Sequence, residues 1–119
     1  MQLEERAVGD VIVLAPSGRM TRNESFGAVQ HRLHDLVQGG RRKLVLDLAA
    51  VSYMDSTCIG ELVSGLVSVR KSGGVLHLAN PTPRVERLLA IAGLTSVFQT
   101  FRSEQAAVLS LAELSPKRS

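Results

Sequence analysis

Apolar runs of strand length alternate with segments of helical periodicity along most of this sequence. The runs VIVLA (11–15), LVLDL (44–48) and VLHLA (75–79) consist mainly of Val and Leu, as buried strands often do. Between them, apolar residues recur every three or four positions, which predicts helices that each bury one face. Strands that alternate with helices usually pair in parallel through right-handed crossovers. The pattern therefore predicts an α/β domain in which helices pack on one sheet.

An N-terminal hairpin is expected before the first helix. Gly9-Asp10 is a turn signal between a strand over 2–7 and the run at 11–15. The segment Pro-Ser-Gly at 16–18 is expected to end the second strand. The full prediction is a mixed, mostly parallel sheet of about five strands with about four helices.

Capping and stop signals bound the expected helices. Asn23 is the expected N-cap of the first helix, and a second is expected over about 57–71. Thr82-Pro83 starts the third, and Ser103 caps the last after a short strand over 97–101. The apolar face of the first helix would comprise Phe26, Val29, Leu33, Leu36 and Val37. We expect one domain over residues 1–114 and a polar tail over 115–119.

Composition excludes several classes of protein. The 119 residues suit one domain, and the 45% hydrophobic share indicates a globular chain. No apolar stretch approaches the roughly 20 residues that span a bilayer, and the acidic start MQLEERAVGD lacks a signal-peptide pattern. The lone Cys58 rules out an internal disulfide and suits a reducing compartment. We therefore expect a cytoplasmic protein without a membrane span.

The positive charge does not indicate a nucleic-acid binder. Net charge is +3, but the basic residues are scattered in small clusters and aromatic residues make up only 3% of the chain. Direct binding to nucleic acid would favour a denser basic stripe or stacking aromatic side chains. Cations near helix ends and a solvated tail explain the pattern better.

One polar junction stands out where a loop, expected over 49–55, connects the strand at 44–48 to the helix that follows. Asp55, Ser56 and Thr57 come where the helix is expected to begin. Asp55 or Ser56 would serve as an N-cap, which is the simplest interpretation. The same helix end would also tolerate a phosphate on Ser56, because helix N-termini favour anions. Such a charge would act on a docked partner more than on the fold.

At this junction the sequence resembles a known family. The segment VLDLAAVSYMDSTCIGELV is similar to the signature of STAS-domain anti-sigma factor antagonists, in which a strand and loop precede Asp-Ser-Ser/Thr-Gly-aliphatic-Gly. VIVLAPSGRM resembles the family's second strand, and GGVLHLANPTPRVERLLAIAGLTSVFQTF its second half. The resemblance covers about residues 8 to 113.

The resemblance implies a bacterial regulatory protein that is not an enzyme and needs no cofactor. In this family the Ser after the motif Asp is phosphorylated by an anti-sigma factor that is also a serine kinase. The unphosphorylated antagonist binds that kinase and frees the sigma factor, and a serine phosphatase resets the switch. The matching phosphoacceptor is Ser56. Asp55 would orient the loop, Thr57 would cap the helix or accept phosphate, and the partner surface would include Thr57, Cys58 and Glu61.

Two departures from the family pattern keep alternatives open. Cys58 stands where the motif has Gly, and the segment 18–23 has Arg19 and Arg22 where many members carry an Asp. The main alternative is a STAS interaction module that is not phosphorylated, either a regulatory scaffold or an accessory subunit of lipid transport. A nucleotide phosphate at the same helix end is a third hypothesis.

Other candidate sites are weaker. Ser56 lacks the G-x-S-x-G context of a hydrolase, and His77, within a strand, has no evident orienting acid. His31 and His34 lie three apart on the first helix, but a metal site usually needs a third ligand, so a solvated helix face is preferred. Cys58 is interpreted as a small packing residue more readily than as a redox-sensitive thiol.

Overall fold

The chain is described by a computed structural model over residues 1–25 and 27–112. Phe26, which the first predicted helix was expected to bury, and the predicted tail over 115–119 lie outside the described residues. The elements are β1 (Gln2–Val8), β2 (Val11–Met20), α1 (Arg22–Ser25), α2 (Ala28–Gln38), β3 (Lys43–Asp47), β4 (Val51–Met54), α3 (Ser56–Lys71), β5 (Val75–Ala79), α4 (Pro83–Ile91), β6 (Thr100–Phe101) and α5 (Glu104–Ala112).

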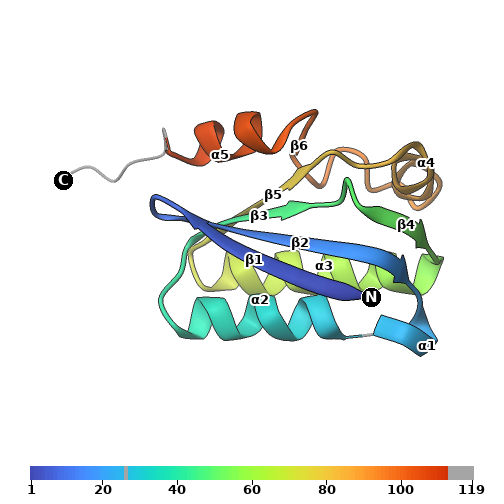
Figure 1. Ribbon diagram of the computed structural model, residues 1–119, viewed down its shortest axis with the longest axis horizontal. Helices are drawn as coiled ribbons and strands as arrows, with labels where there is room; N and C mark the ends of the chain where they lie inside the picture. Colours follow the sequence, from blue (N-terminus) through green and yellow to red (C-terminus); the bar gives the residue numbers. More distant parts are fainter. Residues whose placement is uncertain (26, 113–119) are drawn as a thin grey trace.

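One mixed sheet organises the molecule (Figure 1). Its strand order is β1-β2-β3-β5-β6, and β4 pairs with the far end of β2. Only β1 and β2 are antiparallel within this described sheet, while the other pairs are parallel. The expected α/β fold with an N-terminal hairpin is confirmed, with six strands instead of about five. The expected four helices are α2 to α5, and α1 adds a single turn.

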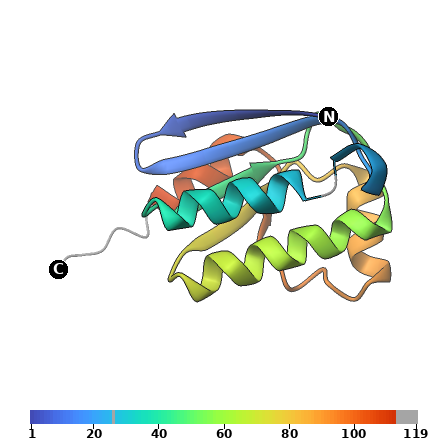
Figure 2. The same ribbon diagram turned by 90° about the horizontal axis from the view of Figure 1, so that it is seen from below.

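Helices cover both faces of the sheet. Helices α2 and α3 lie side by side on one face, and α5 lies on the other (Figures 1 and 2). Alternate residues of β2 serve the two sides: Ile12 and Leu14 join the core under α2 and α3, whereas Val11 and Val13 join the core under α5. Burial on both faces explains why β2 reads as a continuous apolar run.

Strand β2 is longer than predicted, because Pro16 does not end it. Residues 11–14 of β2 pair with β3, and residues 18–20 pair with β4. Gly18 N donates to Ala50 O at 2.9 Å on the β4 side. In a strand, N–H groups two residues apart point the same way. The missing N–H of Pro16 therefore falls where β2 has left β3 and has not yet reached β4, so no ladder bond is lost.

The first predicted helix is divided in two, and Asn23 is not its N-cap. Asn23 lies within the one-turn α1. Helix α2 begins after Gly27, whose φ of 86° and ψ of −14° are left-handed, and Gly27 has no side chain to accept a capping hydrogen bond. A left-handed residue at this junction is a conformation that glycine adopts at little cost.

Two further bounds differ from the prediction, and two caps are confirmed. Strand β4 occupies a segment that was expected to be a loop, and β6 is confined to Thr100–Phe101. Thr82 caps α4 by accepting from Val85 N at 3.3 Å, and Ser103 Oγ accepts from Ala106 N at 3.0 Å at the start of α5. Among residues 1–25 and 27–112, every helix is too short or too polar to cross a bilayer.

Candidate functional site at the start of helix α3

The first turn of α3 is fixed by Asp55. Its Oδ1 accepts a hydrogen bond from Cys58 N at 3.1 Å, and its Oδ2 accepts from Arg22 N at 3.0 Å. Asp55 N donates in turn to Met20 O at 3.2 Å. One residue thus ties the start of α3 to the end of β2 and the start of α1. These elements and α4 meet at one end of the molecule (Figures 1 and 2).

The electrostatics of Asp55 follow from these contacts. The hydrogen bond from the backbone N–H of Arg22 lowers the pKa of the Asp55 carboxyl from its ordinary value of 3.8, and the bonds from Cys58 lower it further. Burial acts in the opposite direction and raises the pKa of Asp55, but its effect is smaller than the combined effect of the hydrogen bonds. The carboxylate is therefore ionised at neutral pH, beside the positive end of α3. Asp55 and Ser56 were the two N-cap candidates proposed from the residues, and Asp55 is the cap. The suggestion from the family resemblance that Thr57 caps the helix is wrong.

Ser56 and Thr57 are both exposed, at the first two positions of α3. Since Asp55 supplies the cap, the Ser56 hydroxyl is not needed to hold the helix end. The sequence therefore located the exposed polar junction correctly.

Glu61 lies away from the surface, contrary to the expectation that it would be exposed. Its side chain is 3% exposed, and its Oε2 accepts from Val29 N at 2.9 Å and from Gln30 N at 3.1 Å. These are N–H groups of the first turn of α2, the turn that Gly27 leaves without a side-chain cap. Glu61 therefore caps a neighbouring helix. The sequence signal was an acid on the apolar face of α3.

Cys58 is also removed from the surface. Its side chain is fully buried in the core between the sheet, α2 and α3. The residue that replaces the motif Gly therefore points inward, as the packing interpretation expected, and a partner docking on α3 does not meet the thiol. Partner contact through Cys58 and Glu61 side chains is thus excluded by burial, while the roles of Asp55 and Thr57 stay predictions.

Arginine side chains from distant segments gather beside the junction. The guanidinium carbons of Arg19 and Arg84 lie 4.8 Å and 4.1 Å from the ring centroid of Tyr53. Arg84 Nε also donates to Met54 O at 3.0 Å. The sequence drew attention to Arg19 and to Arg22, but not to Arg84, because only the fold brings α4 beside β4.

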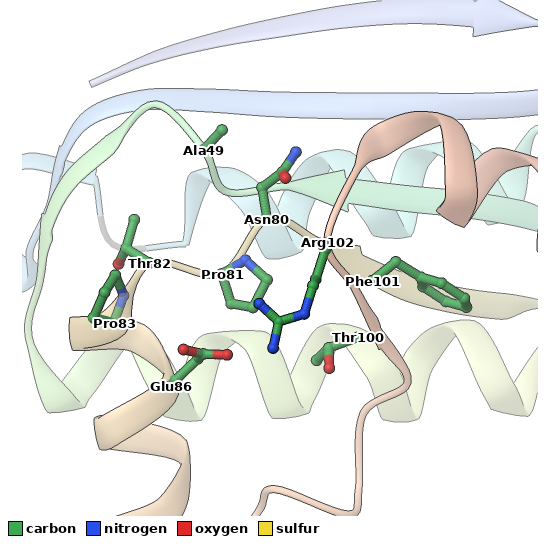
Figure 3. A pocket seen from close by; sticks show the side chains of 9 residues that line it. All are labelled: Ala49, Asn80, Pro81, Thr82, Pro83, Glu86, Thr100, Phe101 and Arg102. Atoms are coloured by element: carbon green, nitrogen blue, oxygen red, sulfur yellow. The ribbon is translucent and has the colours of Figure 1, made fainter.

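A hollow lies at the carboxyl ends of β3, β5 and β6 (Figure 3). It has a volume of about 500 Å³. The side chains of Glu86 and Arg102 point toward one another across it, and Thr82 and Pro83 bring the start of α4 to its wall. Asn80, at φ 53°, holds its rim by donating from Nδ2 to Asp47 Oδ1 at 3.2 Å. No residue proposed from the sequence as a site lies in this hollow.

The remaining candidates lie apart from the junction. His77 is on the α5 side of β5, where its Nδ1 is 3.0 Å from Ser110 Oγ, so it does not face Ser56. His31 and His34 are exposed beside a hollow lined by Gly27, Gln30 and Ser68. Within the described ranges, no group of three or more His, Cys, Asp or Glu side chains is placed to hold a metal ion.

Comparison with known proteins agrees with the resemblance seen in the sequence. A family profile described as the STAS domain matches residues 2–107. The anti-sigma-B factor antagonist of Bacillus subtilis is 39% identical over 73 residues, which are 61% of this chain and 66% of that protein. A solved Thermotoga maritima protein, described as a candidate anti-sigma factor antagonist, has a TM-score of 0.84 and 26% identity, covering 92% of this chain and 94% of that one.

The fold is also shared with the anti-sigma factor antagonist SpoIIAA. Its unphosphorylated form has a TM-score of 0.81 at 16% identity, covering 97% of this chain and 100% of that one. Its phosphorylated form, described as a Bacillus cell fate determinant, has a TM-score of 0.73 at 16% identity, covering 92% and 98%. At this identity the likeness concerns the fold alone.

Proposed function

Because this chain belongs to the STAS domain family, we propose that it is an anti-sigma factor antagonist that works by binding a protein partner. Relatives that bear this name include the Bacillus subtilis protein, at 39% identity. The proposed partner is an anti-sigma factor with serine kinase activity, and a serine phosphatase would reverse the modification. No step of this function requires the chain to catalyse a reaction or to hold a cofactor.

The proposed switch is phosphorylation of Ser56. The observation that carries it is that the cap and the proposed phosphoacceptor are different residues: Asp55 caps α3, while Ser56 is exposed at the first helical position. A phosphate on the Ser56 hydroxyl would leave the Asp55 hydrogen bonds in place. It would carry about −1.5 to −2 charges at the helix end that best accommodates them. The modification is therefore compatible with the fold.

The proposed docking surface is the exposed face of α3. Between positions 56 and 67 its exposed residues fall at helical spacing and comprise Ser56, Thr57, Gly60, Ser64 and Val67, while the exposed cations Arg70 and Lys71 are confined to the last turn. None of the five side chains is charged, so a partner can cover this part of the helix without desolvating an ion. A phosphate at the edge of this surface would have to be desolvated or repelled when the partner docks. The modification would therefore weaken binding without unfolding the protein.

The test compares three forms of the protein as bait in a lysate of the native cell. We expect wild type to retain a small kinase of the anti-sigma factor class and Ser56→Asp to lose it. Ser52→Asp is the matched control, because Ser52 is exposed on β4 and receives the same charge away from α3. If all three baits retain the same partner, Ser56 is not a switch.

A non-phosphorylated STAS interaction module remains the second candidate. The observation that favours it is the segment between β2 and α1, where Arg19 and Arg22 stand in place of the acid found in many antagonists. A kinase adapted to an acidic neighbourhood would meet cations there. Capture of regulatory scaffold or lipid-transport subunits, equally by wild type and Ser56→Asp, would identify this function.

A further inference from the structure

We propose that the arginine pair over Tyr53, Arg19 and Arg84, binds the phosphate of phosphorylated Ser56 within the same molecule. This inference rests on the proposed phosphorylation of Ser56 and concerns what becomes of the phosphate. The ligand class is a phosphomonoester dianion. The site is built by side chains from β2 and α4 and does not consist of the α3 helix end alone.

The position of Arg84 is the first support. Its guanidinium is fixed at two points, by the Nε bond to Met54 O at 3.0 Å and by the Tyr53 ring at 4.1 Å. An arginine has five N–H donors, so the four on the two terminal nitrogens have no hydrogen-bonding partner among the described residues. A fork fixed at its Nε and free at its two terminal nitrogens suits bidentate binding of phosphate oxygens.

The distance along the chain is the second support. Ser56 follows Met54 by two residues, and two residues of extended chain span at most about 7 Å. The guanidinium already touches Met54 O. The Ser56 side chain is exposed, so an attached phosphate can turn about the side-chain bonds. The short separation along the chain therefore places a phosphate on Ser56 within reach of the Arg84 guanidinium.

The local charge is the third support. Arg19 and Arg84 approach one tyrosine ring, so two cations share a small region. The acid beside Ser56 in the chain is Asp55, whose two oxygens already accept from the N–H groups of Cys58 and Arg22. A dianion would relieve the repulsion between the two guanidinium groups. Arg84 in particular forms no ion pair with an acid of the described residues.

The test uses protein that carries phosphoserine at position 56, incorporated during translation so that no kinase is needed. Phosphorus-31 NMR then follows the second ionisation of the phosphate as pH is varied. We expect a pKa below the value of about 6 for free phosphoserine, because adjacent cations favour the dianion. Arg84→Gln should raise this pKa by about 0.5 unit or more. Arg84→Lys should restore part of the shift, since it keeps the charge and loses the fork.

Arg87→Gln is the matched control, because Arg87 lies on the same helix and is exposed. It should leave the phosphate pKa unchanged. Arg19→Gln gives a second reading of the phosphate pKa, without disturbing the hydrogen bond from Arg84 Nε to Met54 O. A wild-type pKa equal to that of the urea-unfolded phosphoprotein would overturn the proposal, as would equal values in wild type and Arg84→Gln. Either result leaves phosphorylation as a switch for partner binding intact, because that claim is tested by capture of the partner.

Discussion

A single carboxylate, Asp55, joins the start of α3 to the start of α1. Asp55→Ala leaves the N–H groups of Cys58 and Arg22 without the carboxylate oxygens that accept their hydrogen bonds. We expect a loss of about 1–2 kcal/mol in the free energy of unfolding, measured by urea denaturation. Thr57→Ala is the control, because Thr57 is exposed and is not the cap, and it should change stability by less than about 0.5 kcal/mol. Equal losses in the two variants would contradict the assignment of the cap.

The pH dependence of this effect has a definite sign. The pKa of Asp55 is lowered in the folded state, chiefly by the Arg22 N–H. Its charge therefore contributes stability above the unfolded pKa near 3.9, and that contribution is lost as pH falls through the lower folded pKa. The difference between wild type and Asp55→Ala should accordingly shrink below about pH 4.

Glu61 gives a second test at the scale of one residue. Glu61→Ala leaves the N–H groups of Val29 and Gln30 without their acceptor in a buried setting. An unsatisfied buried donor costs about 1–3 kcal/mol, so we expect at least about 2 kcal/mol of destabilisation by chemical denaturation. Glu61→Gln keeps an acceptor oxygen and should lose less. A stable, fully folded Glu61→Ala protein would show that Glu61 does not hold α2.

Sequence reasoning reached the residues whose roles are local. Asp55 and Ser56 were recognisable because capping and exposure at a helix start depend on neighbours in the chain. Glu61 and Arg84 were assigned otherwise or passed over, because each acts on a segment about 30 residues away. Burial of Cys58 was suggested by its residue type, but only the packing of α3 against the core decides it.

At the scale of elements, two glycines of α3 report how it packs. A Cβ added at Gly60 meets nothing within 4 Å, whereas one added at Gly65 would lie 2.6 Å from Leu33 Cδ1 of the buried face of α2. Gly60→Ala should stabilise the protein by up to about 1 kcal/mol through helix propensity. Gly65→Ala should destabilise it, because overpacking costs about 1–3 kcal/mol. Thermal unfolding followed by circular dichroism compares the melting temperatures of the two variants. A higher melting temperature than wild type in both would contradict close α2–α3 packing.

The attachment of α5 to the sheet depends on pH through Asp47. Burial raises the pKa of Asp47 from its ordinary value of 3.8. The hydrogen bond from the Ala49 N–H lowers this pKa, whereas a hydrogen bond shared with Glu104 of α5 raises it further, and the net shift is upward. Glu104 itself stays ionised, because a bidentate pair with Arg6 at 2.6 Å lowers its pKa. The stability that Asp47 contributes is thus present below its unfolded pKa and lost as pH rises through the higher folded value.

Asp47→Asn removes this loss while keeping an acceptor oxygen. We expect the variant to gain stability relative to wild type as pH rises from about 3.5 to 7, measured by denaturation at several pH values. The comparison variant is Asp35→Asn, because Asp35 is exposed on α2. A difference that is constant across this range would contradict the raised pKa of Asp47.

The strands and helices that the sequence predicted well are those with strong periodicity. β3, β5, α3 and α4 begin and end close to their expected residues, since apolar spacing and caps agree there. β4 was missed because four residues give little alternation, and its pairing with β2 is a tertiary contact. The division between α1 and α2 was missed because the compensating cap, Glu61, comes from another helix.

At the scale of the whole molecule, the sheet order places the proposed switch at one end. The parallel pairing of β2 with β4 brings Tyr53 beside Arg19, and α4 adds Arg84. The core on both sheet faces fixes these segments, while the α3 face around Ser56 stays exposed. This arrangement separates the parts that hold the fold from the surface that a partner would cover.

The central claim is that phosphate on Ser56 weakens a protein contact without unfolding the domain. The most direct measurement is calorimetric titration of the captured anti-sigma factor with unmodified and Ser56-phosphorylated protein, with circular dichroism of both forms. We predict identical folded spectra and a dissociation constant at least about tenfold higher for the phosphorylated form, equivalent to about 1.4 kcal/mol or more. Equal dissociation constants would contradict the account, and would make Ser56 an exposed residue beside the cap of a constitutive interaction module.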